Sequence, residues 1–536
     1  MLFNSLEFAL FLPVVFLLYW FVFDYALKNC KHQLQLQNAF VVAASYLFYG
    51  WWDWRFLILI AFTSLCSWGS GLLIGKAVVV DANTNANTNT SIEIEIEKEK
   101  RTNKARGKAK FWMILNIVIN LAILATFKYY DFFVSEFCQM FGMKSDGLLL
   151  RVILPVGISF YTFQALSYSI DVYRGKIEPT KDIVAFFAFI SFFPQLVAGP
   201  IERATNLLPQ FLEKREFTYE QGTDGMRQIL WGLFKKIVVA DNCAVYVDQV
   251  WSNYSTQSGS TLLLAAVLFT FQIYGDFSGY SDIAIGTAKL FGIRLMRNFS
   301  NPYFSRDIAE FWRRWHISLT TWFRDYVYIP LGGSRPDIPA DSRHPEIRKK
   351  FIIARNTFVI FLLSGFWHGA NWTFIAWGAY HALLFLPLIL LGKNRKYTNQ
   401  VASYIDADGT ERLRLLPTWK EAFQMLFTFV LVVIGWIIFR SETISQAWEY
   451  IIRIFNTSLF YNPHLINRLY YVPLSVFLLF LIIIEWIDRN NEHGLVLRTI
   501  KFKVLRSIIY IFLFISIEFY FVKTIGQTNT FIYFQF

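Results

Sequence analysis

Charged residues are scarce in this 536-residue chain. They make up 17% of it, whereas a soluble globular protein carries about 25%. Hydrophobic residues make up 55%, above the roughly 45–50% of a soluble protein, and they are gathered in blocks along the chain. A run of roughly 20 apolar residues is long enough to cross a bilayer core of about 30 Å. The composition therefore argues against a soluble multidomain protein and predicts a polytopic membrane protein.

The expected fold class is an all-α polytopic integral membrane protein with roughly 11–13 transmembrane or re-entrant helices. The predicted spans are 8–23, 37–50, 56–75, 111–134, 151–170, 183–199, 226–247, 261–275, 351–367, 371–391, 422–440, 472–488 and 504–524. No basic region precedes the first apolar block and no small-residue cleavage site follows it. We therefore expect this block to be a retained span and not a signal peptide.

The net charge of +12 is assigned to membrane orientation and not to nucleic-acid binding. Basic residues gather in the loops 333–350, 392–420 and 489–503. Because two predicted spans separate each of these loops from the next, all three lie on one side of the membrane. The positive-inside rule makes that side the cytoplasm. The less basic loop 441–471 is then expected to face outward.

A low-complexity tract interrupts the apolar pattern between residues 76 and 110. It contains the run "DANTNANTNTSIEIEIEKEK", with Asn/Thr alternation followed by Ile/Glu alternation. Such a segment buries too little apolar surface to offset its ordering entropy. The Ile/Glu part has the period of an amphipathic strand, but no partner strand is evident. We therefore predict a cytoplasmic loop insertion in a single membrane domain over residues 1–536.

Several kinds of catalytic site lack their signature here. The seven histidines include no HxxH or HxxxH pair, which argues against a membrane di-iron site, and no serine lies in a G-x-S-x-G elbow. Phosphate-binding glycine loops are also absent. Asp276 and Asp282 lie six residues apart among serines, tyrosines and glycines, which is weak support for metal binding. A polar packing or cavity-lining role is favoured for them, and no metal site is expected.

Cysteine is equally uninformative about a bound metal. The chain has four scattered cysteines with no CxxC pair, namely Cys30, Cys66, Cys138 and Cys243. This pattern indicates neither a disulfide framework nor a zinc site.

One histidine lies in the apolar stretch "FLLSGFWHGANWTFIAW". His368 falls at the hinge between the predicted spans 351–367 and 371–391, within the membrane and nearer its outer side. Gly369 is expected to loosen the first helix and Asn371 to cap the second. An ionisable group in a membrane marks a functional site by default. The alternative for a lone histidine is a hydrogen bond to a backbone carbonyl at a helix break.

A second histidine, His316, lies in "DIAEFWRRWHISLTTWFRDYVYIPLGGSR". Its aromatic residues recur at helical spacing, so residues 307–335 are predicted to begin as one amphipathic helix and to end in the turn residues of "PLGGS". Membrane-interface anchoring alone would also explain the aromatic stripe. Two histidines without a metal, a cysteine nucleophile or a serine elbow favour general-base catalysis by imidazole. That chemistry suits attack of a hydroxyl group on an activated acyl group.

These motifs resemble the membrane-bound O-acyltransferase (MBOAT) family, in the branch of the alginate O-acetylases and the teichoic acid D-alanyl transfer protein. The resemblance covers nearly the whole chain. The segments that carry it are "EFWRRWHISLTTWFRDYVYIPLGGS", "FLLSGFWHGANWTFIAWG", "LPVGISFYTFQALSYSIDVYRG", "FFPQLVAGPIER", "YGDFSGYSDIAIG" and "FIYFQF". The two characteristic histidines of the family map onto His368 in "WHG" and His316 in "RRWHIS". The departure is the low-complexity tract after Gly75.

The resemblance implies helices around a central tunnel that joins a cytoplasmic donor to an acceptor outside. The donor would be acyl-CoA, acetyl-CoA by analogy, or the thioester of an acyl carrier protein, and no cofactor would be bound. The acceptor would be an extracytoplasmic polysaccharide or a surface hydrolase-like relay protein. The expected location is the bacterial plasma (inner) membrane, in contact with its lipid and with no nucleic-acid partner.

His368 and His316 are the expected catalytic residues. His368 would take the proton of the acceptor hydroxyl. His316 would orient the thioester, stabilise the oxyanion or share proton handling. Expected tunnel or substrate-binding residues are Trp312, Trp315, Trp367, Gly369, Asn371, Asp276 and Arg314. Two other classes stay open from the sequence: a transporter or flippase for an envelope precursor, and an inert scaffold of a polysaccharide machine.

Overall fold

The computed structural model describes every residue of the chain except 86–91, 198, 335, 337, 339–343, 407, 409, 465–467, 498–499, 501 and 525–536. The ending "FIYFQF", the centre of the low-complexity tract and parts of the loops 333–350 and 489–503 lie outside the described residues. Nearly all of the regular secondary structure in the described residues is helical, which confirms the predicted all-α fold class. Its strands form one antiparallel pair, β1 (Ser403–Ile405) and β2 (Glu411–Leu413), with Tyr404 opposite Arg412.

Eight helical segments in the described residues are long and apolar enough to cross a membrane, which confirms a polytopic protein. They are Leu6–Ala26, Gln33–Ala77, Asn103–Lys128, Gly259–Leu290, Pro345–His368, Trp372–Leu390, Trp419–Arg440 and Lys503–Val522. The number is lower than the 11–13 expected. The predicted spans 37–50 and 56–75 fall together in Gln33–Ala77, and 472–488 falls on a shorter apolar helix, Val472–Ile487. The spans 151–170, 183–199 and 226–247 fall on short or more polar helices.

The chain packs as two compact units, the first being Met1–Thr223 with Thr287–Met296 and the second Asp224–Gly286 with Arg297–Phe536. The interpretation as one membrane domain over 1–536 stays a prediction.

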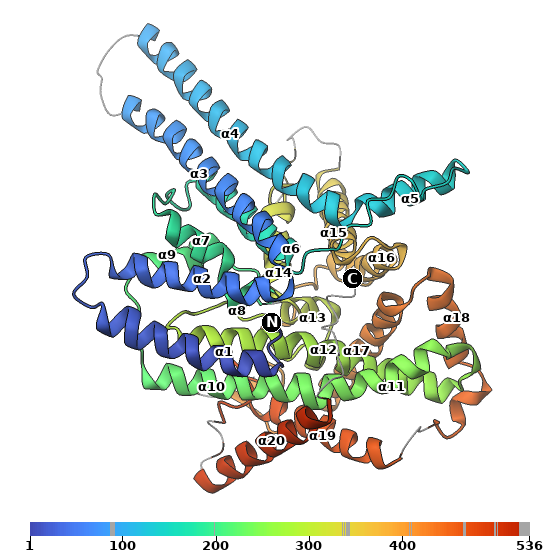
Figure 1. The fold of residues 1–536 in the computed structure, drawn as a ribbon. Coiled ribbons are helices and arrows are strands. Elements are labelled where there is room, and N and C mark those ends of the chain that lie inside the picture. Colours follow the sequence, from blue (N-terminus) through green and yellow to red (C-terminus); the bar gives the residue numbers. More distant parts are fainter. Residues whose placement is uncertain are drawn as a thin grey trace. The chain divides into compact units, whose positions relative to one another are not determined.

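The first unit holds the N-terminal helices. They are α1 (Leu6–Leu17), η1 (Leu18–Ala26), α2 (Gln33–Asp53), η2 (Trp54–Phe56), α3 (Leu57–Asn85), α4 (Ile92–Lys128), α5 (Tyr130–Met140), α6 (Ile158–Tyr173), α7 (Ile183–Ser191), α8 (Phe193–Leu196) and α9 (Ala204–Leu212). Helices α3 and α4 run side by side as a long hairpin (Figure 1). Polar side chains join them inside the apolar packing. Asn116 accepts a hydrogen bond from Ser67 of α3 at 3.2 Å and donates one to Ser169 of α6 at 2.8 Å.

The predicted loop over residues 76–110 is wrong in the part that the structure describes. Helix α3 continues to Asn85, and α4 begins at Ile92 and runs on through the Glu- and Lys-rich part of the tract. Glu, Lys, Arg and Ala are all good helix formers. Their local preference for helix, extended by two long flanking helices, outweighs the low-complexity composition.

The second unit holds the remaining elements, and α10 and α12 each carry a few residues of the first unit as well. These elements are α10 (Tyr219–Leu233), η3 (Phe234–Ala240), α11 (Asp241–Ser252), η4 (Tyr254–Thr256), α12 (Gly259–Leu290), η5 (Pro302–Phe304), α13 (Ile308–Arg314), α14 (Ile317–Phe323), η6 (Arg324–Tyr328), α15 (Pro345–His368), α16 (Trp372–Leu390), α17 (Trp419–Arg440), α18 (Ile444–Ile454), η7 (Thr457–Phe460), α19 (Arg468–Ile487) and α20 (Lys503–Thr524).

Glycines bring two pairs of helices in the second unit into close contact. A Cβ added at Gly365 of α15 would meet the carbonyl oxygen of Phe374 in α16, and one at Gly378 would meet the carbonyl oxygen of Phe361. The glycines of "YGDFSGYSDIAIG" likewise allow close helix packing. Helix α12 is unbroken there, and a Cβ at Gly279 would lie 2.8 Å from the carbonyl oxygen of Gly232 in α10.

Candidate active site

His316 lies at a break in the segment that was predicted to be one amphipathic helix, so this prediction is wrong. Helix α13 ends at Arg314 and α14 begins at Ile317. His316 has a φ angle of +44°, in the left-handed region that non-glycine residues rarely adopt. The break is stabilised because the segment around residues 298–300 forms hydrogen bonds with the backbone on either side of His316. Ser300 donates to the carbonyl of Arg314 at 3.0 Å, and Ile317 donates to the carbonyl of Asn298 at 2.8 Å.

The ring of His316 is enclosed by aromatic side chains. Only 1% of its surface is exposed, and its centroid lies 4.7 Å from the ring of Phe277. Nδ1 lies 2.9 Å from Oδ1 of Asn298. Burial lowers the pKa of the His316 imidazole to about 3, since loss of water disfavours the cation. The ring is therefore neutral at neutral pH.

His368 is the last residue of α15, which confirms the predicted hinge. The side chain is 5% exposed and lies edge-on to Trp377 and Phe439, with centroids 5.2 Å and 5.1 Å away. After the short connection, Oδ1 of Asn371 accepts a hydrogen bond from the backbone of Thr373 at 2.9 Å. This is the predicted N-cap of the following helix.

The two histidines contact one common side chain, the indole of Trp367. Its ring lies 5.8 Å from that of His316 and 4.8 Å from that of His368, measured between centroids. The structure thus brings three of the residues singled out from the sequence together in one aromatic cluster.

The other predicted site residues divide between this cluster and the surrounding packing. Trp312 lies with its ring 5.5 Å from that of Trp377 and lines the cavity described below. Trp315 packs against Trp436 at 4.9 Å and does not line that cavity. A Cβ added at Gly369 would meet the ring of Phe374.

The two charged residues predicted for the site form buried ion pairs. Asp276 lies 2.7 Å from Nζ of Lys236. Arg314 donates to Glu310 at 2.8 Å and to the carbonyl of Ser300 at 3.3 Å. Each charge is compensated where it is buried, and a tunnel or substrate-binding role for Asp276 and Arg314 stays a prediction.

A cavity of about 560 Å³ opens among α13, α14, α15 and α16. Neither histidine lines it, but Ile317 follows His316 directly and Ser364 lies one helical turn before His368. The lining is mostly apolar, and three arginines contribute to it: Arg313, Arg324 and Arg395. An apolar cavity with a few cationic groups suits a long ligand that ends in an anionic group.

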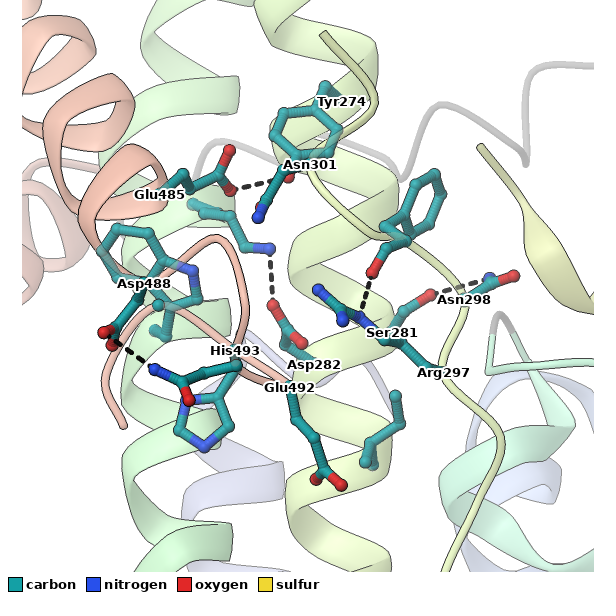
Figure 2. A pocket seen from close by; sticks show the side chains of 16 residues that line it. Tyr274, Ser281, Asp282, Arg297, Asn298, Asn301, Glu485, Asp488, Glu492 and His493 are labelled. Carbon is teal, nitrogen blue, oxygen red and sulfur yellow. Dashed lines mark hydrogen bonds and ion pairs between the residues drawn. The ribbon is translucent and has the colours of Figure 1, made fainter. Parts of the chain in front are cut away.

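A smaller polar pocket in the same unit was not foreseen (Figure 2). Lys235 pairs with Asp282 at 2.5 Å, and the hydroxyl of Tyr274 donates to Glu485 at 2.6 Å. Lys235 and Glu485 fall inside the predicted spans 226–247 and 472–488. Their charge in an apolar span was the signal that could have identified them.

Two further residues near the histidines were also missed. Asn298 bonds to His316, as described above. His381 of α16 is 1% exposed, and its ring lies 5.0 Å from that of Trp312 and 4.9 Å from that of Trp377. Nothing in the spacing of Asn298 sets it apart from any other asparagine, so only the fold could show its role.

Comparison with known proteins places these residues in a family. Residues 178–407 match the sequence profile of MBOAT, the membrane-bound O-acyltransferase family, and this range includes both histidines. The chain is 38% identical over 453 residues to a probable alginate O-acetylase, AlgI, of Pseudomonas aeruginosa, covering 84% of this chain and 74% of that protein. It is 32% identical over 474 residues to a peptidoglycan O-acetyltransferase of Helicobacter pylori, covering 83% and 78%. A teichoic acid D-alanyltransferase of Bacillus subtilis is 27% identical over 297 residues, covering 54% and 69%. The chain belongs to the membrane-bound O-acyltransferase family, and it is an acyltransferase.

Proposed function

We propose that this enzyme moves an acetyl group from a cytoplasmic thioester to a hydroxyl group outside the membrane. The donor would be acetyl-CoA or the thioester of an acyl carrier protein. The acceptor would be an extracytoplasmic polysaccharide or a hydrolase-like relay protein, and the location would be the bacterial plasma membrane. The names of the relatives support this proposal, since they describe acetyl or D-alanyl transfer to alginate, peptidoglycan or teichoic acid.

One observation carries the chemical step: two buried histidines contact the same indole ring beside a cavity large enough for a thioester arm. His368 takes the proton of the acceptor hydroxyl as its oxygen attacks the thioester carbonyl carbon. The new C–O bond forms, the C–S bond breaks, and the leaving thiolate takes the proton back from the imidazolium. General-base help of this kind contributes about 10²–10⁴-fold to the rate.

The donor is proposed to lie in the 560 Å³ cavity with its acyl end towards Ser364 and its anionic end towards the arginines. Arg324 has an exposed guanidinium, with 58% of its side chain accessible, and it uses Nε to pair with Asp325 at 2.7 Å. Its terminal nitrogens are therefore the atoms proposed to meet phosphate. Arg313 already donates to the carbonyls of Asn394 and Tyr397, at 2.9 Å and 2.7 Å. Lipid headgroups are the competing ligand for these cations, and binding of coenzyme A compared with its dephosphorylated form separates the two. Only direct contact with the donor predicts a difference.

The test is formation of a covalently acylated product by the purified enzyme in lipid, supplied with labelled acetyl-CoA and an oligosaccharide acceptor. We expect product from the wild-type protein and near-background product from folded His368→Ala. Wild-type transfer by folded His368→Ala would contradict the assigned role. Movement of an envelope precursor across vesicles without acylated product would instead support a transporter.

A further inference from the structure

The break at His316 depends on one asparagine, Asn298, which is fully buried. Its backbone carbonyl accepts the hydrogen bond of Ile317 at 2.8 Å. Its side-chain Oδ1 lies 2.9 Å from Nδ1 of His316 and 2.9 Å from the hydroxyl of Ser318. A single residue therefore holds three consecutive residues at the point where the backbone is left-handed. Such a conformation is strained in a residue other than glycine, and it persists only where its surroundings fix it.

The partners of the Asn298 amide decide which end faces the histidine. Nδ2 lies 3.0 Å from the hydroxyl oxygen of Ser281 (Figure 2). The opposite end receives the backbone N–H of Ser318 at 3.4 Å, and a backbone N–H can only donate. Rotating the amide by half a turn would set the NH₂ group against this donor. The carbonyl oxygen of the Asn298 amide is therefore the atom that faces His316.

This orientation fixes the proton of the imidazole. A carbonyl oxygen only accepts, so the Nδ1 that lies 2.9 Å from it must carry the hydrogen. Burial keeps the ring neutral, and a neutral imidazole has one N–H and one lone pair. The lone pair is then on Nε2, the nitrogen on the far side of the ring from Asn298.

We propose that Asn298 is a positioning residue that holds neutral His316 in the Nδ1–H tautomer, so that His316 enters acyl transfer as a hydrogen-bond or proton acceptor through Nε2. The catalytic half of this inference rests on the proposed function, and the tautomer does not. A ring without hydrogen on Nε2 has no donor to offer a developing oxyanion. Of the roles considered for His316, oxyanion stabilisation is thereby excluded. The two that remain, orienting the thioester arm and sharing proton handling with His368, both use Nε2 as an acceptor.

The tautomer is tested by ¹⁵N NMR of the full-length protein in lipid, labelled at histidine. With seven histidines in the chain, the His316 signals are identified by their loss in His316→Gln. At pH 7 we expect a protonated Nδ1 and an unprotonated Nε2. Asn298→Asp keeps an acceptor and should keep this tautomer, whereas Asn298→Leu should not. Ser281→Ala is the matched control, because it changes only the Nδ2 side of Asn298. A proton on Nε2 in the wild-type protein would overturn the proposal.

Steady-state kinetics test the catalytic half. Asn298→Leu is expected to lower kcat about 10²-fold with little change in KM, and Asn298→Asp should recover a large part of that loss. Equal losses in the two variants would overturn the positioning role. If the NMR result is as expected while folded His316→Gln transfers acetyl groups at the wild-type rate, the tautomer stands and the catalytic use of His316 is refuted.

Discussion

The indole ring of Trp367 lies 5.8 Å from the imidazole ring of His316, although the two residues come from separate segments. Trp367 also contacts its chain neighbour, His368, at 4.8 Å. Trp367 is therefore the contact that the two histidines have in common. Its ring packs beside both imidazoles and is itself buried, with 4% of its surface exposed.

Two substitutions of Trp367 should show whether an aromatic ring beside the histidines is needed for stability and for catalysis. Trp367→Ala leaves a large cavity, and we expect it to lower the free energy of unfolding by about 3–5 kcal/mol and kcat by at least about tenfold. Trp367→Phe keeps a ring beside the histidines and should lose much less of both. Denaturation and acetyl transfer measured on the same samples compare the two. A folded Trp367→Ala enzyme with wild-type kcat would show that the indole has no part in positioning.

His368 is expected to carry the larger share of catalysis. His368→Gln should lower kcat by about 10²–10⁴-fold with little change in thermal stability, because the amide nearly matches the imidazole in size. His32 is a suitable control, since it is exposed and its Nδ1 contacts only Gln35 among the bonds of the described residues. His32→Gln should behave as wild type. An equal loss of activity in both variants would point to a general effect of losing a histidine.

Stability should depend on pH through His316. Its pKa is near 6.5 in an unfolded chain and is lowered to about 3 in the fold by burial. Between these values the unfolded chain binds a proton that the folded chain does not, so the fold loses stability as the pH falls below about 6.5. Between pH 6.5 and pH 5 the loss is about 1.6 kcal/mol. Denaturant titrations at several pH values should show it.

His316→Gln provides the comparison for that slope, because glutamine does not titrate. In this pH range the unfolded wild-type chain binds about one more proton through His316 than the folded chain does. The variant lacks this proton, so its stability should fall less steeply as the pH is lowered. A slope identical to that of the wild-type protein would place the pH dependence on other groups.

Some parts of the fold and of the candidate site could be predicted from the sequence, and others could not. The apolar blocks and the hinge at His368 followed from hydropathy and from a glycine and a capping asparagine, which act locally. The helical state of residues 76–85 and 92–110 did not follow, because the low-complexity composition of the tract obscures the helix propensity of its Glu, Lys and Ala residues. The helix break at His316 could not be predicted for a different reason. It depends on backbone hydrogen bonds with Ser300 and Asn298, and hydropathy and helical spacing do not show that these two residues lie beside His316.

The ion pair in the polar pocket also could not be predicted from the sequence, because its two partners lie far apart along the chain. Lys235 and Asp282 are both largely buried, with side chains 3% and 14% exposed, and their charged atoms lie 2.5 Å apart. Removing one partner leaves an uncompensated charge. We expect Lys235→Met alone to cost about 3–5 kcal/mol of unfolding free energy. The double variant Lys235→Met/Asp282→Asn should recover much of that loss, as measured by denaturation. Additive losses would show that the two charges are not coupled.

The close contact of α15 and α16 predicts that a larger side chain in place of a contact glycine destabilises the protein. A methyl group at Gly378 would meet the carbonyl oxygen of Phe361, which is backbone and cannot rotate away. Gly378→Ala should therefore destabilise the protein and, by pushing the two helices apart near Trp377, lower acetyl transfer. Gly107 of α4 is the matched control, since a Cβ there meets nothing within 4 Å. Gly107→Ala should stabilise its helix by about 0.8–1 kcal/mol. Thermal unfolding of the two variants in the same lipid should shift in opposite directions, and a shift in the same direction would contradict the close packing at Gly378.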